Sequence, residues 1–111
     1  MSMRWLYHII AADTPVDIGE GSDFAPGSLA TEGFVHCSYR PAVLETARLY
    51  FAQGAKLDVL KLDPRRIAAR IEEAHTPRGP MPHVHGPIPA AAICARMPIA
   101  EIEGMPDALA P

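Results

Sequence analysis

The sequence predicts a small α+β domain, and three observations support this prediction. The 111 residues suffice for one hydrophobic core but not for two, so we expect one domain over 1–111 with a core over roughly 4–103. Apolar segments follow the order strand, strand, helix, strand, strand, strand, with a single substantial helix. Regular βαβ alternation with a glycine-rich phosphate loop is missing, which argues against a Rossmann-type fold. The expected sheet is small, and either mixed or antiparallel.

The predicted strands are short runs rich in aromatic and β-branched residues. They are WLYHII (5–10), EGFVHCS (32–38), KLDVLKLDP (56–64) and AAAICARMPIAEI (90–102). Between the first two strands, residues 13–30 are rich in Gly, Asp, Ser and Pro, and this indicates a long loop with at most one short helical turn. The segment RRIAARIEEA (65–74) fits either a helix or a turn followed by a strand.

The main helix is predicted over residues 40–54. Pro41 suits the first helical position and Gly54 suits the position that ends a helix. An apolar stripe at helical spacing, which we expect to face the core, comprises Val43, Leu44, Ala47, Tyr50 and Phe51.

The chain has 12 prolines, and they are concentrated in the segment TPRGPMPHVHGPIP, residues 76–89. Each proline removes a main-chain donor and disfavours helix in the residue before it. The sequence therefore predicts an ordered extended loop, an edge strand or a mobile lid over this segment.

Composition and charge exclude several classes of protein. Hydrophobic residues make up 49% and charged residues 21%, which is typical of a folded protein rather than a disordered one. A net charge of −3 without a basic stripe argues against a dedicated nucleic-acid surface. No segment approaches the roughly 20 apolar residues of a membrane span, and no signal peptide is evident, so we expect a cytoplasmic protein. Nothing in the sequence indicates an oligomeric state.

Histidines occur where a plain core does not need them. Side chains alternate along a strand, so His8 shares a face with Leu6 and Ile10. By the same rule His36 shares a face with Phe34 and Ser38. If the two strands are neighbours, His8 and His36 can open onto one cleft. The extended HVH projects His83 and His85 to a common side. For His8 and His36 the structural alternative is a core imidazole bonded to a main-chain carbonyl, and for His83 and His85 it is a position that borders a loop.

Four chemistries fit these residues. A metal site could use the HVH pair and one more histidine, but no third ligand has a telling spacing. A phosphoesterase with paired His-x-Ser elements is half present, because HCS fits and HII lacks the hydroxyl. A nucleotide cleft would use His8 on one wall with His36 and Ser38 on the other. A Cys37 nucleophile is disfavoured because alternation points it away from His36.

Four stretches resemble one bacterial family, domain of unknown function 952. They are LYHII, SLATEGFVHCSYRPAVLETARLYF, LKLDP and PHVHGPIPAAAI, and together they extend over roughly residues 4–99. LATEGFVHCS and the pattern PH-x-x-GP-x-P are the specific parts. The family in turn resembles the ADP-ribosyltransferase fold, which includes the tRNA 2′-phosphotransferases.

This second resemblance implies a ligand and roles. It implies that His8 contacts the nicotinamide ribose of NAD, and that His36 and Ser38 match a His-x-Ser element of the phosphotransferases. The late catalytic glutamate of the toxin-type transferases has no clear match, because Glu101 and Glu103 come too late. Of the several arginines around the phosphotransferase site, only Arg40 and Arg78 are candidates here.

The sequence therefore predicts a cleft that binds NAD, ADP-ribose or another small nucleotide-like ligand, with no metal. We assign His36 and Ser38 as catalytic and His8, Tyr7, Arg40, His83 and His85 as cofactor-binding, the last two on a loop that closes over the ligand. If the protein is an enzyme, the reaction is glycosyl or phosphoryl transfer, in which electrostatic positioning does most of the work. The alternatives are a non-catalytic ligand- or partner-binding module and a divalent-metal hydrolase built on the HVH histidines.

Overall fold

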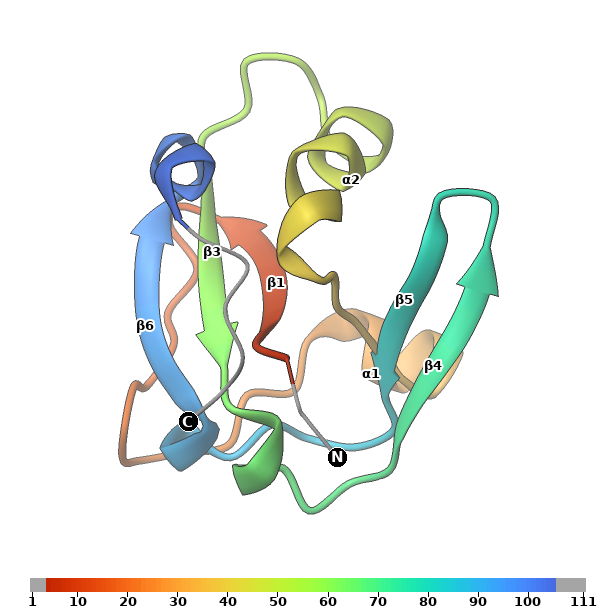
Figure 1. Ribbon diagram of the computed structural model, residues 1–111. Coiled ribbons are helices and arrows are strands. Elements are labelled where there is room, and N and C mark those ends of the chain that lie inside the picture. Colours follow the sequence, from red (N-terminus) through yellow and green to blue (C-terminus); the bar gives the residue numbers. More distant parts are fainter. Residues whose placement is uncertain (1–3, 106–111) are drawn as a thin grey trace.

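Two three-stranded antiparallel sheets form the framework of the computed structural model, which describes residues 4–105 (Figure 1). The first sheet has the order β1-β3-β6, with β1 Leu6–Ala11, β3 Leu57–Leu62 and β6 Ile93–Pro98. The second has the order β2-β5-β4, with β2 Val35–His36, β5 Gly79–Val84 and β4 Ile71–Thr76. The predicted α+β class is confirmed, but the single sheet of the prediction is two sheets.

The helices are short. They are α1 Gly27–Glu32, α2 Val43–Tyr50 and four 3₁₀ turns, η1 Arg40–Ala42, η2 Pro64–Arg66, η3 Ala90–Ala92 and η4 Ile99–Gly104. The main helix begins where Pro41 indicates, through η1, but it ends at Tyr50 and not at Gly54. Phe51 already has an extended conformation, and Gly54 lies in the following loop with φ +83°. Of the two alternatives left open for residues 65–74, the turn followed by a strand is correct and the helix is wrong.

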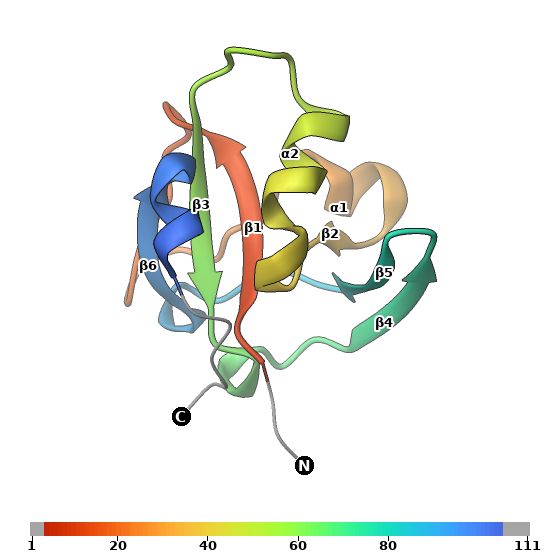
Figure 2. The same cartoon turned by 45° about the horizontal axis from the view of Figure 1, so that its top comes forward.

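Strand β1 is buried on both faces, which agrees with a sequence that is apolar apart from His8. Leu6 and Ile10 face a core cluster that includes Val35 of β2 and Val84 of β5. The alternate residues Tyr7 and Ile9 pack in a second cluster with Val43 of α2 and Ile102 of η4, which lie on the same side of the first sheet (Figure 2). His8 belongs to the first of these two faces by alternation.

The two sheets meet at one isolated β-bridge. The amide of Tyr7 donates to the carbonyl of Ser38 at 2.8 Å, and the amide of Ser38 donates to the carbonyl of Tyr7 at 2.7 Å. The predicted second strand is therefore much shorter than 32–38: only Val35 and His36 join the second sheet, and Ser38 pairs with the first. This exchange of partners brings β1 beside the segment that carries His36.

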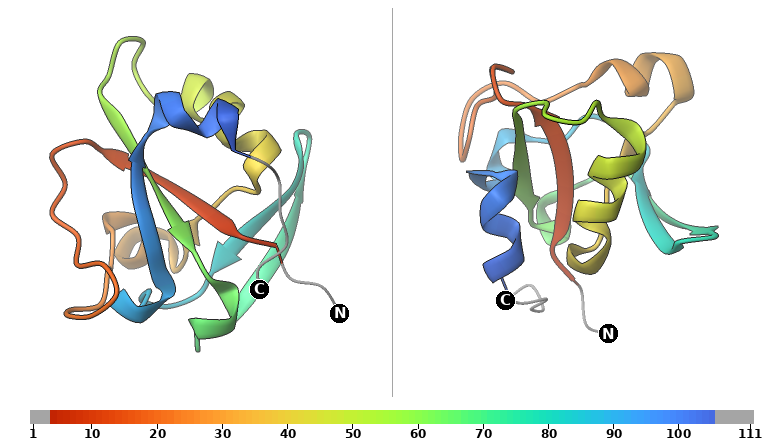
Figure 3. Two further views of the ribbon diagram at one scale, coloured as in Figure 1. Left: turned by 60° about the vertical axis from the view of Figure 1, so that its left-hand side comes forward. Right: turned by 90° about the horizontal axis from the view of Figure 1, so that it is seen from above.

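The proline-rich segment forms most of a β-hairpin that extends away from the first sheet (Figure 3). Its β5 is the central strand of the second sheet, so neither the loop nor the edge strand of the prediction is right. The carbonyl of Pro82 accepts from the amide of Cys37, so Pro82 faces the β2 side, and Pro80 faces the same side by alternation. Neither proline therefore removes a hydrogen bond from the ladder with β4.

No helix within residues 4–105 has the length and apolar character needed to cross a membrane.

Candidate functional site

A cavity of about 650 Å³ lies between α2, α1, β2 and the β4–β5 hairpin. Its walls carry histidines from three different strands, His8 of β1, His36 of β2 and His83 of β5. The remaining lining residues are Tyr7, Ile9, Pro26, Ser28, Glu32, Cys37, Ser38, Thr46, Tyr50, Phe51, Thr76, Arg78 and Met81. The structure therefore brings together five of the seven predicted site residues and leaves Arg40 and His85 outside.

His8 is the buried imidazole of the site, 9% exposed. Its Nδ1 lies 2.6 Å from the main-chain oxygen of His36, and because a carbonyl can only accept, Nδ1 carries the proton. Burial lowers the pKa of His8, which keeps the ring neutral, so Nε2 presents a lone pair. The structural alternative for His8 is thus correct for one nitrogen, while no residue within 4–105 hydrogen-bonds to the other.

His36 is not in a buried position, contrary to the expectation for an apolar strand. Its side chain is 51% exposed, whereas its neighbours Val35 and Cys37 are buried on the opposite face. Nε2 of His36 lies 2.8 Å from a carboxylate oxygen of Glu32, at the end of α1. An imidazole held by a carboxylate at the rim of a cavity can hold or pass a proton.

Phe34 organises the other two imidazoles of the site. It stacks on His83 with ring centroids 4.0 Å apart and meets His36 edge-on at 4.6 Å. Burial, followed by the proximity of His36, lowers the pKa of His83. His85 also approaches Phe34, at 5.7 Å, which agrees with a common side for the HVH pair.

His85 nevertheless does not line the cavity. Its Nε2 lies 2.9 Å from a carboxylate oxygen of Glu72 on β4, and this hydrogen bond is the main cause of the lowered pKa of Glu72. The predicted role of His85 as a ligand contact has no support from its position. Within residues 4–105 no three His, Cys, Asp or Glu side chains group closely enough to hold a metal ion. The HVH metal site is therefore not formed in this part of the chain.

Ser38 and Tyr7 line the inner part of the cavity beside the bridge that joins the sheets. Ser38 is 3% exposed, and its hydroxyl donates to Oγ1 of Thr46 on α2 at 3.3 Å. Tyr7 is 1% exposed. Cys37 is fully enclosed, and burial raises its pKa to about 12, so it stays a thiol and is no nucleophile.

Arg40 has a structural role. Its Nε donates to the carbonyl of Met105 at 2.6 Å and its Nη2 to that of Glu103 at 2.7 Å, which ties the start of η1 to η4. It does not line the cavity, so its predicted contact with a cofactor is not supported.

Arg78, Tyr50 and Thr46 line the cavity although none of them was assigned to the site, and Arg78 was only a candidate implied by the resemblance to the phosphotransferases. Tyr50 was expected on the core face of the helix, but it is 65% exposed because α2 ends there. Thr46 and Tyr50 are four residues apart and so share a helix face. For Arg78 the available signal was the run TPRG, which has proline at the second and glycine at the fourth position of a type I turn and thereby places Arg78 at a hairpin tip.

Fold and site define an α+β protein with a histidine-lined cavity at the junction of two antiparallel sheets. The model of the family described as protein of unknown function (DUF952) matches residues 12–96. The chain therefore belongs to this family. No curated protein gives a significant match.

Solved structures show a similar fold. The crystal structure of protein CC0527 from Caulobacter crescentus superposes with a TM-score of 0.64 at 18% identity, covering 85% of this chain and 84% of the other. A double mutant of the same protein gives the same values.

Proposed function

We propose that the cavity binds a nucleotide-type ligand with an ADP-ribose part, such as NAD or ADP-ribose. The observation that carries the proposal is the convergence of His8, His36 and His83 on one cavity. A volume of about 650 Å³ lies within the range of about 300–1,000 Å³ typical of small-molecule sites. The likeness of the family to the ADP-ribosyltransferase fold is part of the proposal.

The hydrogen-bonding state of His8 favours a sugar hydroxyl as its partner. Because Nδ1 donates to the His36 carbonyl, the neutral ring offers only an acceptor at Nε2. A ribose hydroxyl can donate to this lone pair, while an anion would be repelled by it. His8 therefore selects a neutral donor, in agreement with a ribose.

In the catalytic form of the proposal, His36 and Ser38 act on the bound ligand in glycosyl or phosphoryl transfer. His36 has a carboxylate partner in Glu32, and Ser38 has a hydroxyl partner in Thr46.

A non-catalytic binding module is the second candidate. It is favoured by the placement of Glu101 and Glu103 on η4, neither of which lines the cavity.

Histidine NMR shifts during titration with ADP-ribose and NAD test the binding. We expect the imidazole signals of His8, His36 and His83 to move while that of His75, an exposed residue outside the cavity, stays fixed. Unchanged signals of the three cavity histidines at millimolar ligand would refute the proposal. Incubation with labelled NAD, alone and with RNA or protein acceptors, then separates the two forms: a product supports transfer, and binding without product supports the module.

A further inference from the structure

Arg78 occupies the tip of the β4–β5 hairpin, above the cavity. Oγ1 of Thr76 donates to the carbonyl of Gly79 at 2.7 Å and accepts from the amide of Arg78 at 3.2 Å. Gly79 has φ +101°, a conformation that favours glycine. The hydroxyl of Thr76 thus bonds main-chain atoms at Arg78 and after it, and these hydrogen bonds fix the backbone of the turn.

The guanidinium of Arg78 is only partly satisfied. Its Nη2 donates to the hydroxyl of Tyr50 at 2.9 Å, and its Cζ lies 5.2 Å from the centre of that ring. Its Nε is buried without a hydrogen-bond partner, and no other side-chain nitrogen or oxygen within residues 4–105 is in this condition. No carboxylate in the same part of the chain forms an ion pair with it.

Two other partly buried arginines, Arg40 and Arg96, donate hydrogen bonds to oxygen atoms. Arg96 donates to the carboxylate of Asp58 and to two main-chain carbonyls, and Arg40 donates to two carbonyls. An unpaired buried donor lowers the stability of a protein. Such an atom therefore calls for an explanation, and a functional role of the group is one of the recognised explanations.

The surroundings of Arg78 favour an anion. Among the described lining residues Arg78 is the sole arginine or lysine. Glu32 is the sole carboxylate, and it is engaged by His36. The hydroxyl of Tyr50 accepts from Arg78, so its own proton remains to be donated to a further acceptor. A phosphate offers three oxygens to these donors, and the planar fork of an arginine suits it.

We propose that Arg78, assisted by the Tyr50 hydroxyl, is the phosphate anchor of the cavity. The inference rests on the proposed function for the rest of the ligand, whose ribose contacts His8. A phosphoryl or pyrophosphoryl group takes the Nε–H and Nη2–H donors of Arg78, and Tyr50 turns its hydroxyl proton toward the same group. Tyr50 is exposed at the end of α2 and can make this adjustment.

Calorimetric titration with matched probes tests the anchor. The probes are adenosine, AMP, ADP-ribose, inorganic pyrophosphate and, as a carboxylate control, citrate. In Arg78→Gln we expect the affinity for AMP, ADP-ribose and pyrophosphate to fall at least tenfold, while the affinity for adenosine changes less than twofold. Arg48→Gln is the matched control, because Arg48 is an exposed arginine of α2 outside the cavity, and it should behave as wild type.

Two further variants refine the result. Arg78→Lys keeps the charge and loses the fork, so it should recover only part of the affinity. Tyr50→Phe removes a single hydroxyl from an exposed side chain and should weaken AMP and pyrophosphate several-fold without affecting adenosine. This variant serves as the test if Arg78→Gln does not fold.

The outcomes separate the anchor from the proposed function. Equal AMP affinity in Arg78→Gln and Arg48→Gln, with the His8 signal still moving on addition of AMP, would overturn the anchor alone. Citrate binding that depends on Arg78 as strongly as pyrophosphate binding would overturn the preference for phosphate. Pyrophosphate binding that needs Arg78, with no adenosine-containing ligand bound, would support the anchor and refute the ADP-ribose site. Failure of every probe to bind the wild-type protein would overturn both.

Discussion

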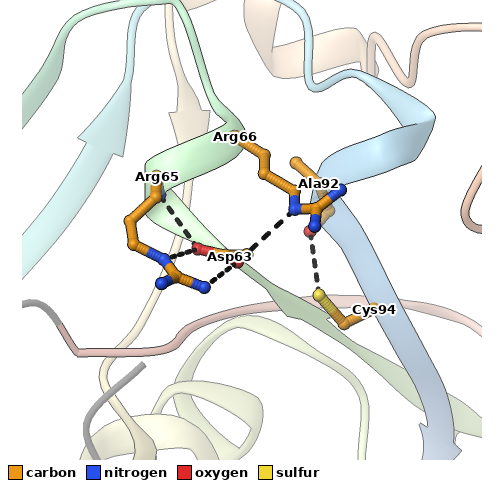
Figure 4. Close-up of polar contacts among 5 residues, drawn as sticks. All are labelled: Asp63, Arg65, Arg66, Ala92 and Cys94. Atoms are coloured by element: carbon orange, nitrogen blue, oxygen red, sulfur yellow. Dashed lines mark hydrogen bonds and ion pairs between the residues drawn. The ribbon is translucent and has the colours of Figure 1, made fainter. Parts of the chain in front are cut away.

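Two polar regions of this protein differ in how completely their groups are paired. The first surrounds Asp63, which is 2% exposed at the end of β3 (Figure 4). Its Oδ1 accepts from the amide and Nε of Arg65, and its Oδ2 lies 2.8 Å from Nη2 of Arg65 and 3.7 Å from Nε of Arg66. Both carboxylate oxygens are thus used by residues that follow directly in the chain.

The second region is the cavity, where pairing is incomplete. Nε2 of His8 and Nε of Arg78 have no partner within residues 4–105, and the Tyr50 hydroxyl has a proton to donate. A buried polar group that is fully paired within the chain can stabilise the fold, but it has no capacity left for a ligand. The comparison therefore assigns a structural role to Asp63 and agrees with the proposed binding role of the cavity.

The largest effect on stability is expected from Asp63→Ala. The substitution removes the side chain that caps η2, accepts hydrogen bonds from Arg65 and forms an ion pair with Arg66, so we expect the free energy of unfolding to fall by about 2 kcal/mol. Urea denaturation measures it, and ligand affinity should not change. Glu101→Ala, which removes an exposed carboxylate on η4, is the control and should change stability by less than about 0.5 kcal/mol. An equal, small loss in both variants would remove the structural role of Asp63.

An intermediate effect is expected from pH, in separate windows for the two regions. The pKa of His8 is lowered by burial, so below the unfolded value of about 6.5 the unfolded chain binds a proton that the folded protein does not. Stability should therefore decrease as the pH falls from 7 to 5. The hydrogen bond from Arg65 lowers the pKa of Asp63, so its contribution is present above the unfolded value of about 3.9 and is lost in more acidic solution.

Variants separate these two windows in thermal unfolding. His8→Gln should flatten the dependence between pH 7 and 5, with the part due to His83 remaining. Asp63→Asn should lower stability at neutral pH, where the carboxylate is charged, and should flatten the pH dependence only below about pH 4. An unchanged slope in His8→Gln would show that the pKa of His8 is not lowered in the folded protein, which would contradict the burial of its imidazole as a neutral ring.

The smallest effect on stability is expected from His36→Gln. Its contact with Glu32 is half exposed on both sides, and such pairs contribute about 0–1 kcal/mol. Under the proposed function the same substitution should weaken ADP-ribose binding at least tenfold, measured by calorimetry. A substitution that alters affinity but hardly alters stability is the reverse of Asp63→Ala. Loss of stability without loss of affinity would place His36 with Asp63 instead.

Sequence reasoning located the histidines of the cavity because strand alternation is a local property. His8 and His36 could be placed on faces of their strands from their neighbours alone, and the HVH spacing similarly gave His83 and His85 a common side. Which of that last pair reaches the cavity depends on Glu72, which lies on the neighbouring strand and engages His85. That information is not local.

The prediction failed where the effect of a residue depends on its partner. Pro80 and Pro82 led to the prediction of a loop. The missing amide of a proline disrupts a sheet only if it would face a hydrogen-bonded neighbouring strand, and the sequence does not show which side of the strand is paired. Tyr50 fits the apolar stripe of the helix, and only the early end of α2 exposes it. The sequence made Arg40 and Arg78 equal candidates for a ligand contact. In the structure Arg40 donates to the main-chain carbonyls of Glu103 and Met105, whereas Nε of Arg78 has no partner within residues 4–105.

The Tyr7–Ser38 bridge has a mechanical consequence. It joins the main chains of the two sheets, which also share a core cluster, and residues on both sides of it line the cavity. A molecule held by His8 on one half and by His83 or Arg78 on the other would act as a brace across this joint. A bound ligand would then reduce the motion of the two sheets relative to each other, including parts of the protein that do not contact the ligand.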